Sequence, residues 1–322
     1  MNLSQTILNI TFSNPTVLAS GIWGITSSSW KAAAKCGAGG ITTKSLWPEE
    51  HKGNVNPTII STDTWMLNAV GVPDAGPEKA REEIGDFMKD HPVPLIANII
   101  GLNTKQFATI TAAIAPLQPD AFEVNLSTPT FLKLRGKLFA EDKKEIATIV
   151  KAIKKEAGKI PVFVKLTPNV PNIGELAKAA VAAGADGITA INTVGPGMAI
   201  DLRSRMPILA AHKGGLSGPA LKPIAVRCVA EIYEATEGQV PIIGTGGVYT
   251  GEDAIEMLLA GASLVGVGTA VATRGADIFQ KICDEIQYWC TNEGVDNVSD
   301  LVGGMHQELL KRGKKGTEMK HV

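Results

Sequence analysis

Apolar residues along this chain fall into short unbroken runs, and stretches with helical spacing separate most of these runs. In one such stretch Ile146, Ile149 and Ile153 lie on the same face of a helix, and Gly158 follows as a stop signal. A strand that is apolar at every position is typical of a parallel sheet covered on both faces. The predicted strands are residues 16–21, 39–45, 94–100, 121–127, 161–167, 187–193, 241–243 and 264–267.

Eight strands that alternate with helices predict an α/β fold, a (β/α)8 TIM barrel. A small hairpin around residues 8–12 precedes the first strand, and no linker-like or low-complexity segment divides the chain. We therefore expect a single domain over residues 1–322, with residues 297–322 as a polar, peripheral tail. Two long loops, residues 46–76 and 195–219, are expected over the C-terminal face of the barrel, because loops of this length are usually functional.

Composition and charge exclude several classes of function. The formal net charge of −1 provides no basic field for nucleic acid or for an anionic membrane. No apolar run is long enough to span a bilayer, and the first residues lack the basic start and apolar core of a signal peptide. The four cysteines show no CxxC spacing, so we expect no disulfide framework, metal site or iron–sulfur cluster within this chain. These features predict a cytoplasmic protein.

Glycine turns follow the last two predicted strands. Gly244, Gly246 and Gly247 come after residues 241–243, and Gly268 follows the final strand. Glycine lets backbone N–H groups approach a phosphate closely, because no side chain stands in the way. The loops after the seventh and eighth strands are also the usual phosphate site of a TIM barrel. The pattern therefore predicts a phosphate-binding corner, although an ordinary strand–helix–strand unit with turn glycines would look similar in isolation.

Polar side chains also gather at the C-terminal ends of the predicted strands, the face that carries the active site in a TIM barrel. Turn chemistry explains one asparagine at such a place, but five amide or amine side chains inside apolar runs need another explanation. They suit a flat, hydrogen-bonding, partly anionic ligand that carries a phosphate, and FMN fits that description. These five residues are Lys44, Asn98, Asn125, Lys165 and Asn192.

Several segments together resemble the class 1 dihydroorotate dehydrogenases. The resemblance covers roughly residues 1–290 in the right order, and two segments are similar to the branch that works with an electron-transfer subunit. Those two segments are residues 66–71 and 214–225. The other matching segments are Ala19-Ser20-Gly21, Thr43-Lys44, residues 123–127, Val164-Lys165, Asn192-Thr193, residues 244–247 and Gly268-Thr269.

The resemblance implies an FMN-dependent oxidation of dihydroorotate to orotate in pyrimidine biosynthesis. By motif position Lys165 is expected beside the pyrimidine end of the flavin, where its charge stabilises the anionic reduced form. The implied cofactor-binding residues are Ala19, Ser20, Gly21, Lys44, Asn98, Asn125, Lys165, Gly218, Gly246, Gly247, Gly268 and Thr269. The implied substrate-binding residues are Lys44, Asn68, Asn125, Asn192 and Thr193.

The chain departs from the family pattern at the expected catalytic base. Class 1 enzymes carry cysteine where this chain has Thr128, and a substrate-binding asparagine where it has Thr130. A threonine hydroxyl is far less acidic than a thiol and has to pass the proton onward, through water or a neighbouring group. Class 2 relatives use serine at this place, so we expect Thr128 to serve as a relay base, with Lys165 as the second catalytic residue.

Two alternative functions stay open from the sequence. One is an FMN oxidoreductase that acts on another dihydropyrimidine or cyclic amide, and the other is a non-redox barrel that binds a phosphorylated ligand. The electron acceptor is also open: without iron–sulfur cysteines in this chain, use of NAD⁺ would require a partner subunit that carries FAD and an iron–sulfur cluster. The resemblance implies such a partner subunit, and a homodimer that uses a soluble acceptor is the alternative.

Overall fold

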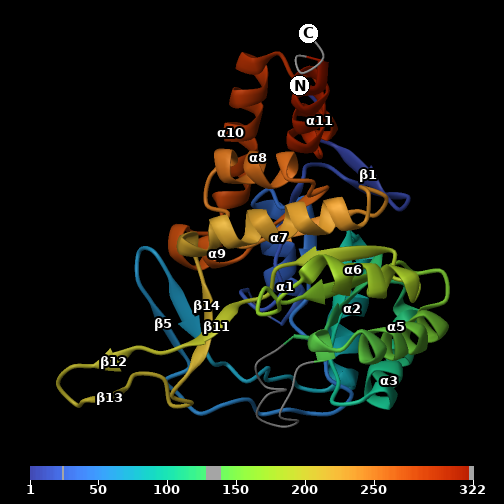
Figure 1. Cartoon of the computed structure of the whole chain (residues 1–322). Coiled ribbons are helices and arrows are strands. Elements are labelled where there is room, and N and C mark those ends of the chain that lie inside the picture. Colours follow the sequence, from blue (N-terminus) through green and yellow to red (C-terminus); the bar gives the residue numbers. More distant parts are fainter. Residues whose placement is uncertain (24, 128–138, 319–322) are drawn as a thin grey trace.

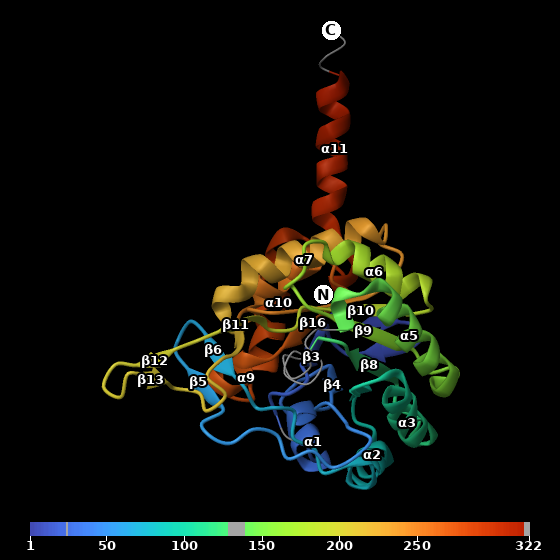
Figure 2. The ribbon, with the colours of Figure 1, turned by 60° about the horizontal axis from the view of Figure 1, so that its bottom comes forward.

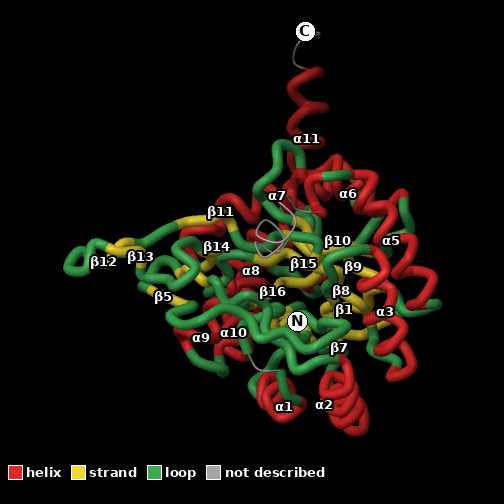
Figure 3. Tube along the Cα trace, turned by 90° about the horizontal axis from the view of Figure 1, so that it is seen from below, coloured by secondary structure: helices red, strands yellow, loops and turns green. Residues whose placement is uncertain are grey.

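The core of the molecule is a closed barrel of eight parallel strands, with helices around it (Figures 1 and 3). The structure is a computed structural model, and it describes every residue except 24, 128–138 and 319–322. Closure comes from the pairing of the last barrel strand with the first, where Val265 lies opposite Thr16. The barrel strands are β3 (Thr16–Leu18), β4 (Gly40–Thr42), β7 (Leu95–Ile99), β8 (Ala121–Asn125), β9 (Val162–Leu166), β10 (Gly187–Ala190), β15 (Ile242–Thr245) and β16 (Leu264–Val267). The predicted barrel is confirmed.

The helices bury their apolar faces against the outside of the barrel. In α5 (Lys143–Ala157) the predicted face of Ile146, Ile149 and Ile153 is fully buried, and the Asp142 side chain caps the first turn by accepting two backbone N–H groups. The other helices are α1 (Ser27–Lys35), α2 (Pro77–Asp90), α3 (Thr104–Ile114), α6 (Ile173–Ala182), α7 (Lys222–Ala235), α8 (Gly251–Leu259), α9 (Thr269–Arg274) and α10 (Ile278–Glu293). Short 3-10 turns are η1 (Ala115–Leu117), η2 (Phe139–Glu141) and η3 (Pro219–Leu221).

An N-terminal hairpin closes the bottom of the barrel. Its strands are β1 (Gln5–Ile7) and β2 (Ile10–Phe12), so the hairpin lies slightly earlier than the sequence pattern suggested. Ile7 and Phe12 pack against Phe163 and other residues at the N-terminal ends of the barrel strands. This apolar plug leaves the opposite end of the barrel as the open end.

A small antiparallel sheet covers that open end, and it is built from the two long loops (Figure 1). Its strands, in spatial order, are β11 (Val194–Gly197), β14 (Gly214–Ser217), β6 (Met66–Asn68) and β5 (Ile59–Ser61). Between β11 and β14 the chain extends outward as an arm, β12 (Ile200–Asp201) with β13 (Met206–Pro207). These strands have two to four residues each, and the pairing of β14 with β6, which joins the two loops, spans about 150 positions of sequence, so local patterning carried no sign of the sheet.

The end of the chain combines a packed turn with a projecting helix. Val298 and Leu301, in η4 (Val298–Leu301), are buried against the body. Helix α11 (Gly304–Glu318) follows and extends away from the body (Figure 2). Among the residues that the structure describes, no helix combines the length and the apolar character that a membrane crossing requires.

Candidate active site

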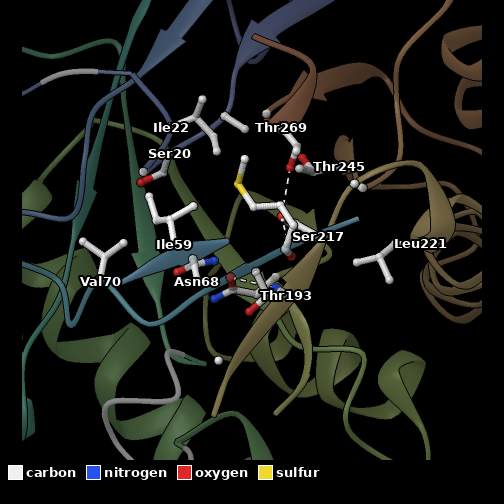
Figure 4. Close-up of a pocket in the computed structure, with 18 of the residues that line it drawn as sticks. Ser20, Ile22, Ile59, Asn68, Val70, Thr193, Ser217, Leu221, Thr245 and Thr269 are labelled. Carbon is white, nitrogen blue, oxygen red and sulfur yellow. Dashed lines mark hydrogen bonds between the residues drawn. The ribbon is translucent and has the colours of Figure 1, made fainter. Parts of the chain in front are cut away.

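A cavity of about 510 Å³ lies at the C-terminal ends of the barrel strands, beneath the small sheet (Figure 4). Its volume falls within the range of small-molecule and cofactor sites. The structure brings together in its lining most of the residues that the sequence pattern singled out. They are Ala19, Ser20, Gly21, Lys44, Asn68, Asn125, Lys165, Asn192, Thr193, Gly218, Gly246, Gly247, Gly268 and Thr269.

Two of the predicted site residues, Asn98 and Thr128, are not among the described residues that line the cavity. Asn98 is fully buried and is absent from the lining of the cavity, so the structure places it behind the surface that a ligand would touch. Thr128 lies outside the described residues, as does Thr130. Asn98 donates its amide nitrogen to the neighbouring Glu123, whereas its Oδ1 has no partner among the described residues, so its contact with the cofactor stays a prediction.

The glycine turn after β15 forms one corner of the cavity. Gly246 and Gly247 have φ angles of +128° and +78°, which L side chains rarely adopt. A Cβ atom at Gly247 would also lie 2.5 Å from the backbone nitrogen of Lys222, at the start of α7. Nearby, the Thr269 hydroxyl donates a hydrogen bond of 2.9 Å to Ser217 on β14 (Figure 4). Glycine backbone and hydroxyl groups therefore form part of this corner, as a phosphate site requires.

A network of amide and hydroxyl side chains forms a second part of the wall. Asn192 Nδ2 donates to Ser127 Oγ at 2.9 Å, and the same nitrogen lies 3.4 Å from Asn125 Oδ1. Asn125 Nδ2 in turn donates to Ser45 Oγ at 3.2 Å. These bonds hold the two amides in fixed orientations at the ends of β8 and β10, the two strands that flank β9 in the barrel. Oriented amides recognise a planar ligand that both donates and accepts hydrogen bonds.

A buried ion pair lies at the floor of the cavity. Lys165 Nζ is 3.3 Å from Glu123 Oε1, and their side chains are only 7% and 2% exposed. The same carboxylate oxygen accepts a hydrogen bond of 2.5 Å from Asn98 Nδ2. Lys165 lines the cavity, whereas Glu123 does not. The floor therefore presents an amine to the ligand and keeps the matching carboxylate behind it.

Lys44 supplies a second amine, after β4, three strands along the barrel from the strand that carries Lys165. Burial lowers the pKa of the Lys44 ammonium, and the charge of Asp74 partly opposes this shift. Burial also raises the pKa of Asp74, against hydrogen bonds from backbone N–H groups such as that of Gly76, at 2.7 Å. An anionic ligand beside Lys44 would restore a counter-charge to this ammonium.

Comparison with known proteins decides the family. A family model described as "Dihydroorotate dehydrogenase" matches residues 2–289. This chain belongs to the dihydroorotate dehydrogenase family.

Known proteins are similar in sequence to this chain over nearly its whole length. Two curated relatives are named "Dihydroorotate dehydrogenase B (NAD(+)), catalytic subunit". The one from Methanocaldococcus jannaschii is 44% identical over 308 residues, which cover 95% of this chain and 98% of the relative. The one from Methanothermobacter thermautotrophicus is 40% identical over 304 residues, 94% and 98% of the two chains. A crystal structure of the Eimeria tenella enzyme in complex with ferulenol has a TM-score of 0.81 at 26% identity, covering 95% and 89%.

Within this dihydroorotate dehydrogenase fold, the cysteines are placed away from the cavity. None of the four contributes to its lining, and Cys228, Cys283 and Cys290 are buried in the helical layer. Burial raises the pKa of the Cys228 thiol and of the Cys283 thiol to about 11, which disfavours the thiolate. No cysteine therefore lies at the described part of the cavity, where it could act as a base.

Sequence reasoning missed several polar residues of the site. Ser45 and Ser217 line the cavity and bind other lining side chains, and Asp74 modulates Lys44. All three come from the loops or from the small sheet, where no periodic pattern marks a position as inward-facing. Glu123 is different, because a carboxylate in the middle of an apolar strand was a visible signal.

Proposed function

We propose that this protein is an FMN-dependent dihydroorotate dehydrogenase that oxidises dihydroorotate to orotate in de novo pyrimidine biosynthesis. One observation carries the proposal: a single cavity joins two amines and oriented amides to a glycine-lined corner at the C-terminal face of the barrel. This donor set matches a flat anionic substrate next to a phosphorylated cofactor. Relatives that are 40–44% identical over almost their full length bear the name of this enzyme.

The residues fit FMN. The turn of Gly246 and Gly247, with Gly268 and Thr269, would hold the phosphate through backbone N–H groups. A Cβ atom at Gly246 or at Gly247 would collide with Ala225 or with Lys222 and so displace that turn. Lys165 and Asn125 would hold the polar edge of the ring, and Ala19, Ser20, Gly21, Lys44 and Gly218 would complete its surroundings. When bound, FMN supplies the acceptor for a hydride.

The substrate would lie against the amide network. Lys44 offers a charge to the orotate carboxylate, and Asn68, Asn125, Asn192 and Thr193 offer hydrogen bonds to the ring. The reaction removes a proton from one ring carbon and a hydride from its neighbour, which leaves a C=C double bond. We assign the proton to Thr128, which follows Ser127 in the chain and passes it on to water or to a neighbouring group.

The names of the relatives favour a partner subunit. They are catalytic subunits of an NAD(+) enzyme. We infer that this chain delivers its electrons to an electron-transfer subunit that carries FAD and an iron–sulfur cluster, with NAD⁺ as the final acceptor, and that two catalytic chains associate. A cytoplasmic location is part of the same proposal.

An anaerobic titration tests the proposal. The purified protein should be yellow from bound FMN, and dihydroorotate should bleach the spectrum because the flavin becomes reduced. A specific observation favours one second candidate: Thr128 and Thr130 both depart from the family pattern at the substrate. If the protein is yellow but dihydroorotate does not bleach it, another dihydropyrimidine or cyclic amide is the substrate. A protein that binds no FMN even when FMN is added would contradict the assignment.

A further inference from the structure

Glu123 lies in the interior of the barrel, one layer below the floor of the cavity. Alternate residues of a strand share a face, so Ala121, Glu123 and Asn125 point the same way from β8. Ala121 belongs to the apolar plug, and Asn125 lines the cavity. Glu123 therefore occupies the layer between an apolar core and the ligand site, where it is 1% exposed. An ionised carboxylate in such a place requires partners, because burial of an unpaired charge is strongly unfavourable.

The partners come from the two neighbouring strands. Glu123 lies directly opposite Asn98 of β7, and Oε1 accepts the 2.5 Å hydrogen bond from its amide. The same oxygen contacts Lys165 of β9 at 3.3 Å. Thr43 Oγ1 accepts a hydrogen bond of 3.0 Å from the Asn98 backbone N–H, and this bond holds the backbone of Asn98 in place. One carboxylate oxygen thus ties together three adjacent strands beneath the ligand.

From this arrangement we infer that Glu123 is a positioning residue for the flavin site: it holds the Lys165 ammonium at the floor of the cavity and offsets its charge. The inference rests on the proposed function, because it assumes that the ligand above Lys165 is FMN. Asn98 belongs to this support as well. Its amide nitrogen donates to the carboxylate and it does not line the cavity, so through this bond it holds Glu123 in place.

The position of the carboxylate has a consequence for the cofactor. Lys165 without a counter-ion would present a full positive charge to the ring, whereas Lys165 with Glu123 behind it presents a dipole. Because a full charge stabilises an anion more strongly than a dipole does, Glu123 limits the preference of the site for the anionic reduced flavin. A carboxylate at this place therefore sets the balance between oxidised and reduced FMN without touching the cofactor.

The test compares the affinities of oxidised FMN and of FMN reduced by dithionite, measured on apoprotein of each variant at one fixed pH. In Glu123→Gln, we expect the ratio of the two dissociation constants to move toward the reduced form by about ten-fold or more, because the negative charge is removed while the size of the side chain is kept. In Lys165→Met the ratio should move the opposite way.

Two further variants separate this role from a merely structural one. Glu123→Asp keeps the charge but shortens the reach, so FMN affinity should fall for both redox forms while their ratio stays within about three-fold of wild type. Glu175→Gln makes the same chemical change in an exposed ion pair with Lys143, 2.8 Å apart, and should leave both affinities unchanged. Thermal unfolding of each variant shows whether it is folded.

The results for Glu123→Gln decide whether Glu123 has this role. A ratio in Glu123→Gln that equals wild type, or that moves in the direction of Lys165→Met, would overturn the inference. The proposed function is judged separately, on the bleaching of wild-type protein by dihydroorotate. An enzyme that bleaches normally while Glu123→Gln leaves the ratio unchanged would retain its function and lose this role for Glu123.

Discussion

The glycine at the phosphate corner allows a sharp test of the site. In Gly247→Ala the new residue has to adopt a φ near +78°, which costs about 1–2 kcal/mol for an L residue. Its Cβ would also lie 2.5 Å from the backbone nitrogen of Lys222, which cannot move freely because its side chain is paired with Asp253 and Glu256 on α8. Such overpacking adds about 1–3 kcal/mol, so we expect a total loss of stability of roughly 2–5 kcal/mol.

A matched control measures the cost of the positive φ angle alone, without the steric contact. Gly294 ends α10 with a φ of +70°, and a Cβ there would meet nothing within 4 Å. Gly294→Ala should therefore lose only about 1–2 kcal/mol, and it should bind FMN like the wild type. Urea unfolding of the apoprotein measures both losses.

Gly247→Ala should also weaken the binding of FMN, because the new Cβ displaces the turn at the phosphate corner. If relief of the contact with Lys222 removes one backbone hydrogen bond to the phosphate, about 1.5–3 kcal/mol of binding is lost, which raises the Kd for FMN roughly ten- to hundred-fold. Fluorescence titration of the apoprotein with FMN measures this Kd. A Kd for Gly247→Ala within about two-fold of wild type would refute the assignment of the corner, as would an equal weakening in Gly294→Ala.

Other predictions concern the substrate side of the cavity. Because the lowered pKa of Lys44 means that its ammonium is lost at a lower pH than in an exposed lysine, orotate binding should weaken as the pH rises through that value. Asp74→Asn removes the charge that opposes this shift, so the loss should move to still lower pH in an orotate titration, and Lys44→Met should abolish this pH dependence. Thr128→Ala should slow flavin reduction by dihydroorotate about 10²- to 10⁴-fold in stopped flow. Thr128→Ser should retain most of the rate, because it keeps the hydroxyl. An unchanged rate in Thr128→Ala would show that this hydroxyl is not the base. Asn192→Ala should weaken orotate binding by about 1–3 kcal/mol in the same titration, since Ser127 also loses its donor.

The sequence by itself determined the barrel, and it placed most of the predicted site residues at the cavity. Apolar strands and amphipathic helices are local patterns, and parallel strands that alternate with helices have few ways to close. A residue such as Lys165 or Asn192, at the carboxyl end of a strand, then has to face the open end. The glycine turns after β15 and β16 could be located for the same reason, because each follows its strand directly in the sequence.

Only the tertiary structure decided which of these residues touch the cavity and which support it. Asn98 and Asn125 look alike in sequence, at the ends of neighbouring strands. However, Asn125 reaches the cavity, whereas Asn98 is turned toward Glu123 in the layer below. The small sheet over the mouth and the proximity of Asp74 to Lys44 also depend on pairing between distant segments. Such contacts depend on packing between segments far apart in the chain, and a local pattern of apolar and polar residues carries no information about them.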